Sequence, residues 1–155
     1  MRGWLFRGLG VVLALVLCEL VLTLGARLSP RIDYLLRPPW NRIAVDDPQL
    51  GVRGSEFAPG HDANGFRNPE VPERAEILAV GDSMTYGYAA APGDSWPRQL
   101  ERLLGRRVYN MSFGGYSPWQ YELLVERGLE LDPERVVVAL FVGNEFSESY
   151  RDVWL

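Results

Sequence analysis

Three short segments of this 155-residue chain are rich in glycine and polar residues, and each follows an apolar run. They are Gly81-Asp82-Ser83-Met84-Thr85-Tyr86-Gly87, Asn110-Met111-Ser112-Phe113-Gly114-Gly115 and Gly143-Asn144-Glu145. A serine that follows a strand and is flanked by glycines can expose its hydroxyl and offer its own backbone N–H to an oxyanion. A second N–H from a glycine turn and the side-chain amide of an asparagine would complete a hole with three donors. These residue types are the ones that acyl transfer requires.

Strands are predicted immediately before all three segments. The candidates are Ile77-Leu78-Ala79-Val80, Val108-Tyr109-Asn110 and the run Val136–Val142, which is the most strand-like part of the chain. This last run is apolar on both faces, as is typical of a strand covered by helices on both sides. Because active sites in parallel sheets lie at the carboxyl ends of the strands, we expect the three segments to meet at one edge.

Two helices are predicted between these strands. The first spans residues 96–104, with Asp94 or Ser95 as its cap and Gly105 as its stop. Its apolar face is predicted to consist of Leu100, Leu103 and Leu104. The second helix spans about residues 117–129 and opens with Ser-Pro-Trp-Gln, a capping box with proline at the first helical position. This alternation of strands and helices predicts an α/β fold with a parallel sheet and helices on both faces.

In order and spacing, the motifs Gly-Asp-Ser-x-Thr-x-Gly, Asn-x-x-x-x-Gly and Gly-Asn-Glu resemble blocks I, II and III of the SGNH (GDSL-type) hydrolases, over about residues 62–150. The resemblance implies a three-layer α/β/α sandwich with a flavodoxin-like parallel sheet. It also implies the activity of an esterase, a lipase, or a carbohydrate acetyl-esterase or acyltransferase. By this resemblance Ser83 is the nucleophile and an oxyanion donor, Gly115 is the second donor and Asn144 is the third. Glu145 stands where the family usually has aspartate, which leaves the Asn144 donor intact.

The catalytic acid and base of the family form an Asp-x-x-His motif near the end of the domain, and this sequence has no counterpart of it. The single histidine, His61, lies in a segment rich in proline and glycine, and we interpret it as a solvated loop residue rather than as the general base. Asp82 is expected to order the Ser83 loop by accepting hydrogen bonds from backbone amides. The third strand of a flavodoxin-like sheet would here be an unpaired apolar edge. We therefore expect a truncated domain that is inactive alone and lacks its histidine.

Residues 1–28 are predicted to be a membrane anchor. The run between Arg7 and Arg27 is broken only by Glu19 and has roughly the 20 residues that a helix needs to cross a bilayer. A cleaved secretion signal is the alternative, although the run is long for one. Glu19 would be costly at mid-bilayer, so it is either tolerated in a single anchor or pairs with a partner helix. The rest of the chain is then expected to be extracytoplasmic, in the periplasm or at the cell surface.

Residues 29–75 are predicted to be a stalk, because they hold seven of the 11 prolines and show little hydrophobic periodicity. Within them Asn64-Gly65 is a turn signal that would lead Phe66 onto the edge of the domain. The sequence Asn64-Gly65-Phe66-Arg67 ahead of block I also resembles membrane-anchored bacterial members of the family. Residues 76–155 would then form the hydrolase-like domain.

Composition excludes several classes of function. With 16 basic and 20 acidic residues the chain has a formal charge of −4, so the basic surface of a nucleic-acid-binding domain is not expected. A single cysteine, Cys18, allows no internal disulfide, and with a single histidine no zinc site of the usual Cys/His spacing can form. No metal or cofactor is therefore expected, and the expected partners are the membrane and an acyl ester or acylated carbohydrate substrate.

Two other functions stay open at the level of sequence. One is a non-catalytic surface protein that binds glycan, or a domain completed by a partner, on a degenerate hydrolase fold. The other is a flavodoxin-like nucleotide binder with phosphate on the loop of residues 83–87. The second is disfavoured because neither G-x-G-x-x-G nor G-x-x-x-x-G-K-[ST] occurs, and because Asp82 would repel phosphate.

Overall fold

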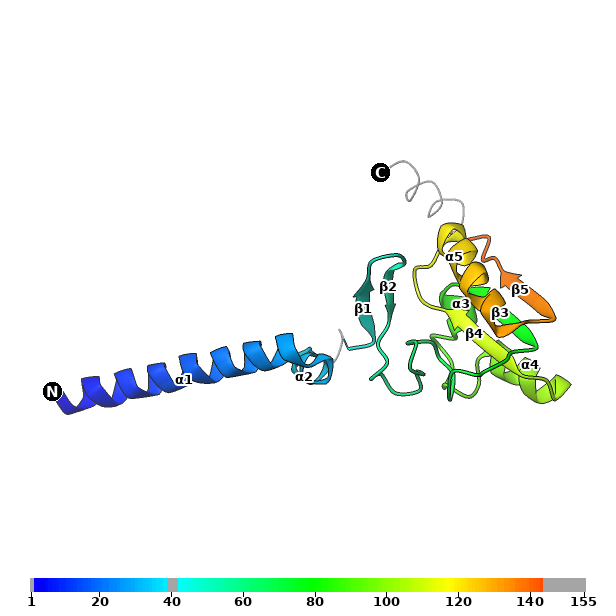
Figure 1. The fold of residues 1–155 in the computed structure, drawn as a ribbon. Coiled ribbons are helices and arrows are strands. Elements are labelled where there is room, and N and C mark those ends of the chain that lie inside the picture. The colour runs from blue at the N-terminus through cyan, green and yellow to red at the C-terminus, as the bar shows by residue number, and fades with distance from the viewer. Residues whose placement is uncertain (1, 39–41, 144–155) are drawn as a thin grey trace. The chain divides into compact units, whose positions relative to one another are not determined.

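The computed structural model describes residues 2–38 and 42–143 (Figure 1). The chain divides into two compact units, Met1–Arg42 and Ile43–Leu155, and each is described by itself. The described part of the first unit is helical, whereas the second combines strands and helices.

In its described residues the first unit contains two helices, α1 (Arg2–Leu28) and α2 (Pro30–Leu36). Within α1, the 22 residues Arg7–Leu28 are long and apolar enough for a membrane span or a signal sequence, and an 18-residue window of this segment has a mean hydropathy of 2.5. Pro30 opens α2, and α1 ends just before it because proline has no N–H with which to continue the helical hydrogen bonds. The predicted long apolar helix is thus confirmed.

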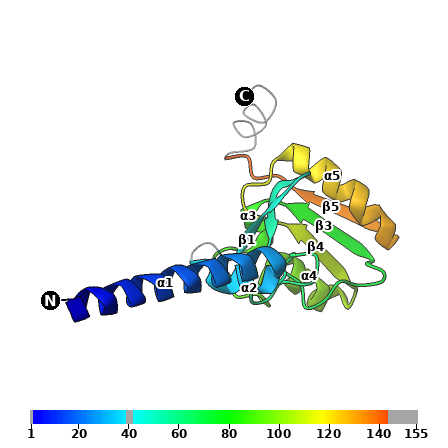
Figure 2. The same ribbon diagram turned by 60° about the vertical axis from the view of Figure 1, so that its left-hand side comes forward.

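The second unit is built on a parallel sheet of three strands, β3 (Ile77–Gly81), β4 (Val108–Ser112) and β5 (Arg135–Ala139) (Figure 2). β3 is central, with β4 on one side and β5 on the other. All five residues of β3 are buried, as befits a short apolar strand between two neighbours. The predicted α/β class and parallel sheet are confirmed, and among the described residues β5 has the predicted edge position.

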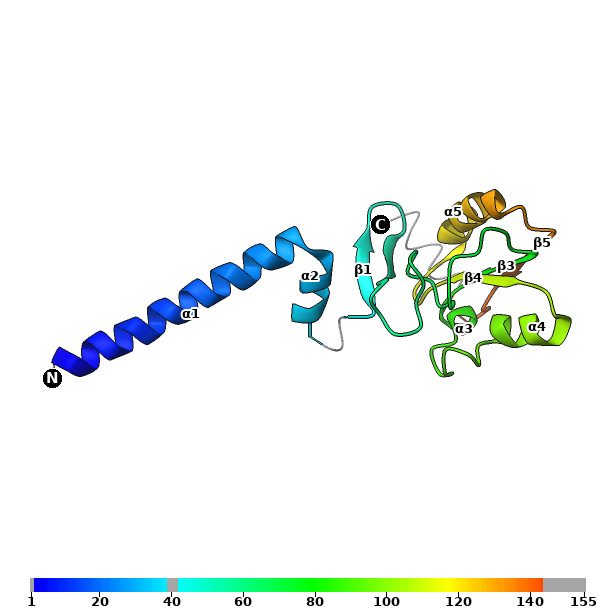
Figure 3. The same cartoon turned by 60° about the horizontal axis from the view of Figure 1, so that its bottom comes forward.

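Helices α4 (Trp96–Leu104) and α5 (Pro118–Gly128) pack on opposite faces of this sheet (Figure 3). Successive strand residues point to opposite faces, so the strands contribute to two separate core clusters. The cluster on the α5 face includes Leu78, Val80, Tyr109, Met111, Tyr121 and Leu124. On the α4 face Ile77, Ala79 and Val108 pack against Trp96 and Leu100.

The helix ends follow the sequence signals. Ser95 is the N-cap of α4, and Gly105 ends this helix with a φ of 63° in the left-handed region that favours glycine. Ser117 and Gln120 form the predicted capping box at the start of α5, where the Ser117 N–H donates to Gln120 Oε1 at 2.8 Å.

Two predicted details of the elements are wrong. The face of α4 that packs on the sheet reaches only to Leu100, whereas Leu103 is 82% exposed and Leu104 is exposed as well. β5 ends at Ala139 rather than at residue 142, because its partner β3 turns into the next helix after Gly81, the residue paired with Ala139. The side chains of Val136, Val137 and Val138 are between 36% and 44% exposed.

The second compact unit begins at Ile43, ahead of residue 76, where the composition placed the start of the domain. Strands β1 (Ala44–Asp47) and β2 (Gly51–Gly54) form an antiparallel hairpin in this added part. Leu50, Phe66 and Ala75 are buried in the same cluster as the α5 face of the sheet. These contacts involve single apolar residues between prolines and glycines, which give no periodic pattern in the sequence.

Candidate functional site

Two of the three predicted segments leave the sheet at one edge. Gly81 pairs with the last residue of β4 and the last residue of β5, so the chain leaves all three strands at the same level. Ser83 lies two residues beyond this level, at the start of the short helix α3 (Ser83–Tyr86), and Gly115 lies three residues beyond it on the β4 side. Asn144, in the third segment, lies outside the described residues.

Ser83 is presented by a tight turn from strand to helix. Asp82 caps α3, since its Oδ1 accepts the N–H of Met84 at 2.8 Å, which confirms its predicted ordering role. Gly81 has no room for a side chain, because a Cβ there would lie 2.2 Å from Thr85 Oγ1. The Ser83 side chain is partly exposed, and within the described part of the chain no hydrogen bond holds its hydroxyl.

The turn after β4 is positioned by two glycines. Gly115 is exposed and has a φ of 83°, which favours glycine. Gly114 packs directly on Tyr88, where a Cβ would lie 2.5 Å from the ring atom Cε2. Since Tyr88 is the second residue after α3, this contact joins the second predicted segment to the first.

A buried polar network supports both segments. Asn68 Oδ1 accepts the N–H of Asn110 at 3.0 Å, and Asn68 Nδ2 donates to Asn110 O and Asp62 Oδ2, each at 3.0 Å. Asn110 Nδ2 donates to the carbonyl of Thr85 in α3 at 3.1 Å, and the Ser112 hydroxyl donates to Asn110 Oδ1. Because every one of these residues is buried, the network fixes α3 to β4 and to residues 62–68.

Arg67 holds the end of α3 and the turn after it. Its Nη1 donates to the carbonyls of Tyr86, at 3.3 Å, and Gly87, and its Nη2 donates to the carbonyl of Ala90 at 2.8 Å. The guanidinium carbon also lies 4.9 Å from the centre of the Tyr86 ring, within cation–π range. One side chain thus fixes the backbone from residue 86 to residue 90.

His61 is not the solvated loop residue that its surroundings in the sequence predicted. It is partly buried, and its Nδ1 lies 2.8 Å from Ser55 O, which can only accept, so Nδ1 carries the proton. Nε2 then accepts the hydroxyl of Tyr86 at 2.7 Å. The loop that carries His61 folds back onto α3. The imidazole therefore makes a hydrogen bond that stabilises the fold, rather than one to Ser83.

This bond predicts a pH dependence of stability. Burial lowers the pKa of His61 below 6.5, and burial raises the pKa of Tyr86 to about 12, so both groups are neutral at pH 7. Below about pH 6.5 the unfolded chain binds the proton first, so stability should fall as the pH is lowered toward the folded-state pKa. The free energy of unfolding, measured with urea, should be lower at about pH 5.5 than at about pH 7.5. In His61→Gln, the part of this difference that comes from the imidazole should be absent. Equal pH dependence in both proteins would contradict this assignment.

Sequence reasoning gave no role in the site to Asp62, Arg67 or Asn68. Their only signal is the density of polar residues around the Asn64-Gly65 turn, and such residues are equally common in solvated loops. The turn itself is confirmed: the Gly65 N–H donates to Asp62 O at 3.0 Å, and Phe66 is buried.

Comparison of the chain with protein-family models, curated proteins and solved structures finds no match in any of the three. In the described ranges 2–38 and 42–143, no group of three or more His, Cys, Asp and Glu residues could hold a metal ion.

Proposed function

We propose that this chain carries the nucleophile of an ester hydrolase or acyltransferase of the SGNH type. The observation that carries the proposal is the Ser83 turn: a partly exposed serine, whose hydroxyl has no hydrogen bond within the described residues, at the carboxyl end of the central strand. The proposal includes the three-layer flavodoxin-like fold of that family. The strand order β4-β3-β5 and the packing of α4 and α5 on opposite faces support it.

In the proposed reaction, Ser83 Oγ attacks the carbonyl carbon of an ester while its proton passes to a histidine. The oxyanion that forms accepts hydrogen bonds from the N–H groups of Ser83 and Gly115 and from the Asn144 side chain. Because Ser83 is the first residue of α3, its N–H has no partner within the helix. The ester C–O bond then breaks, and the alcohol leaves with the proton from the histidine. The histidine then takes a proton from water, or from a sugar hydroxyl in a transferase, as its oxygen attacks the acyl carbon. The bond from this carbon to Ser83 Oγ breaks, Oγ takes the proton back from the histidine, and the acid or the new ester leaves.

The general base in this proposal comes from outside this sequence. His61 is the one histidine in the chain, and its two ring nitrogens are bonded to Ser55 O and the Tyr86 hydroxyl. A base must be within hydrogen-bond reach of the nucleophile, and the hydrogen bonds of His61 go to Ser55 and Tyr86 rather than to Ser83. The chain alone is therefore expected to hydrolyse esters very slowly.

We also propose that the site works outside the cytoplasm, on an acyl ester or an acylated carbohydrate, with α1 as a membrane anchor. The length and apolar character of α1 support the anchor. A secretion signal with the same properties would give the same location for the second unit, without the attachment.

The experiment that tests the proposal is labelling of the full chain, in lipid nanodiscs, with a fluorophosphonate. Labelling should be slow and should accelerate when free imidazole is added, because Ser83 is partly exposed and a small base can take the place of the absent histidine. Ser83→Ala should abolish the label. The chain provides an internal control, because Ser95 stands in a second Gly-Asp-Ser sequence but is buried. Fragment mass spectra should therefore place the label on Ser83 and not on Ser95.

Two results would overturn the proposal. Equal labelling of wild type and Ser83→Ala would mean that the reagent reacts elsewhere and that the Ser83 turn is not activated. No labelling of either protein at any imidazole concentration would favour a non-catalytic surface protein. Rapid hydrolysis of a short aryl ester without imidazole, lost in Ser83→Ala, would leave the nucleophile in place but refute the external base.

A further inference from the structure

A cavity of about 370 Å³ lies beside Ser83, between α3, the turn that follows it and the start of α4. Its lining includes Ser83 together with Met84, Tyr88, Ala89, Ala90 and Trp96. Apart from the serine, these side chains offer a thioether, two methyl groups and two aromatic rings. Asp94, Ser95 and Gln99 also line the cavity, and the Asp94 carboxylate is the one charged group among the lining residues. The space next to the candidate nucleophile is therefore suited to an apolar group.

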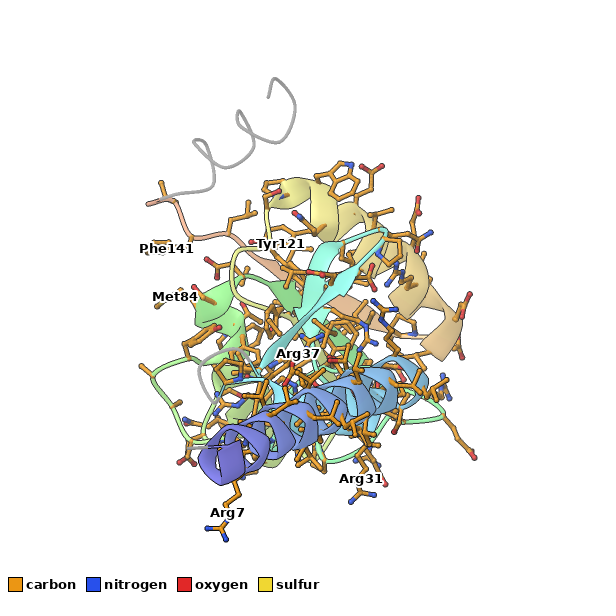
Figure 4. All side chains as sticks on the ribbon, turned by 90° about the vertical axis from the view of Figure 1, so that its left-hand side faces the viewer. Arg7, Arg31, Arg37, Met84, Tyr121 and Phe141 are labelled. Carbon is orange, nitrogen blue, oxygen red and sulfur yellow. The ribbon has the colours of Figure 1, made fainter. Side chains whose placement is uncertain are left out.

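Two of these side chains are unusually exposed for their size and apolar character. Met84 is 61% exposed and Tyr88 is 54% exposed, although both are next to or near Ser83 in the chain. Figure 4 shows Met84 projecting outward from α3, on the same side of this unit as Phe141. Apolar side chains gathered around a pocket on a protein surface commonly mark a ligand site. Methionine also adapts its shape to flexible apolar ligands.

The wall of the cavity is held in place before any ligand arrives. Arg67 binds the carbonyls of Gly87 and Ala90, and a Cβ on Gly87 would lie 2.8 Å from the Cβ of Ser95, so the turn is packed tightly against the start of α4. On the far side, Gln99 Nε2 donates to the carbonyl of Asp94 at 2.8 Å. A fixed cavity loses little entropy when a chain enters it, which favours selection by length.

We propose that this cavity binds the acyl chain of the ester that Ser83 attacks, and that it selects an unbranched acyl group of medium length over acetyl. The inference rests on the proposed function, since it takes Ser83 as the point where the carbonyl is held. An acetyl group would leave most of the cavity empty and most of its apolar side chains without a contact. The alcohol part of the ester, sugar or other, would lie on the open side of Ser83.

The first test uses fluorophosphonates that carry ethyl, butyl, hexyl or octyl chains, with full-length protein in nanodiscs and added imidazole. The rate of Ser83 labelling should rise about fourfold per methylene until the cavity is full, the factor expected when one CH₂ leaves water for an apolar site. Ala89→Phe should fill the cavity and reduce the gain to less than about twofold across the series. Ala91→Phe is the matched control, because Ala91 is an exposed alanine two residues further on that does not line the cavity. The ratio between variants cancels any partitioning of the reagents into lipid.

A second measurement is independent of Ser83 reactivity. Bound 6-bromohexanoate should quench the fluorescence of Trp96 in a saturable way, and the quenching should be lost in Trp96→Phe and in Ala89→Phe but kept in Ala91→Phe. Flat labelling across the series, with Ser83 still labelled, would overturn the acyl cavity and leave the proposed function standing. Absence of saturable quenching would likewise overturn it. Saturable quenching without labelling of Ser83 would support the cavity while the proposed nucleophile fails.

Discussion

Replacing Gly65 with alanine is expected to lower the free energy of unfolding of the Ile43–Leu155 unit by more than about 4 kcal/mol. A Cβ at Gly65 would lie 1.9 Å from the carbonyl oxygen of Gly54, and this backbone atom cannot rotate aside as a side chain could. Gly65 also has a φ of 82°, which costs an L-residue roughly another 1 kcal/mol. Urea unfolding followed by tryptophan fluorescence measures the loss, and a unit this destabilised is expected to be largely unfolded without urea.

Gly105→Ala is the matched control for the backbone conformation. Gly105 has a φ of 63°, but nothing lies within 4 Å of the position that its Cβ would take. Its replacement should cost about 1 kcal/mol, the conformational penalty alone. If Gly65→Ala were no more destabilising than Gly105→Ala, the close approach between Gly54 and the Gly65 turn would be refuted.

The second large effect is expected from Asn68→Ala, which should cost about 3 kcal/mol or more. This substitution removes the partners of three buried groups, the N–H and the carbonyl of Asn110 and the Oδ2 of Asp62. Water cannot easily replace the lost amide, because Asn68, Asn110 and Asp62 are all buried. The effect is measured by urea unfolding, with Asn64→Ala beside it.

Asn64 is a suitable control because it is an exposed asparagine in the same turn. Among the residues that the structure describes, its side chain makes one hydrogen bond, from Nδ2 to the Tyr109 hydroxyl at 3.2 Å. Asn64→Ala should therefore cost no more than about 1 kcal/mol. Similar losses in the two variants would mean that the network of Asn68 does not support β4 and α3 as the structure describes.

The same network connects stability to the candidate site. Asn110 donates to the carbonyl of Thr85, within the helix that presents Ser83, and Asn68 holds Asn110. Residues 62–68 thus support the Ser83 turn without lining it. This is the physical reason why residues 62–68, which the composition predicts to be part of a stalk, belong to the same compact unit as the sheet.

Local patterns in the sequence were sufficient to predict β3, the end of α4 and the start of α5, but not the short helix α3 that presents Ser83. The apolar run before Ser83 predicts β3, and Gly105 and the Ser117 capping box predict the end of α4 and the start of α5. Asp82 was predicted to order the Ser83 loop, which the bond to the Met84 N–H confirms. Such features depend on residues close together in the chain, so the types and spacing of those residues determine them.

The tertiary structure alone decided what supports these elements. His61 bonds Tyr86 across 25 positions of the chain, and Asn68 bonds Asn110 across 42. Neither hydrophobic periodicity nor a turn rule predicts such a pairing. The pairing is favoured because it gives hydrogen-bond partners to polar groups that become buried only when the core folds. For the same reason the sequence could name Ser83 as a candidate nucleophile, whereas only the fold could place an apolar cavity beside it.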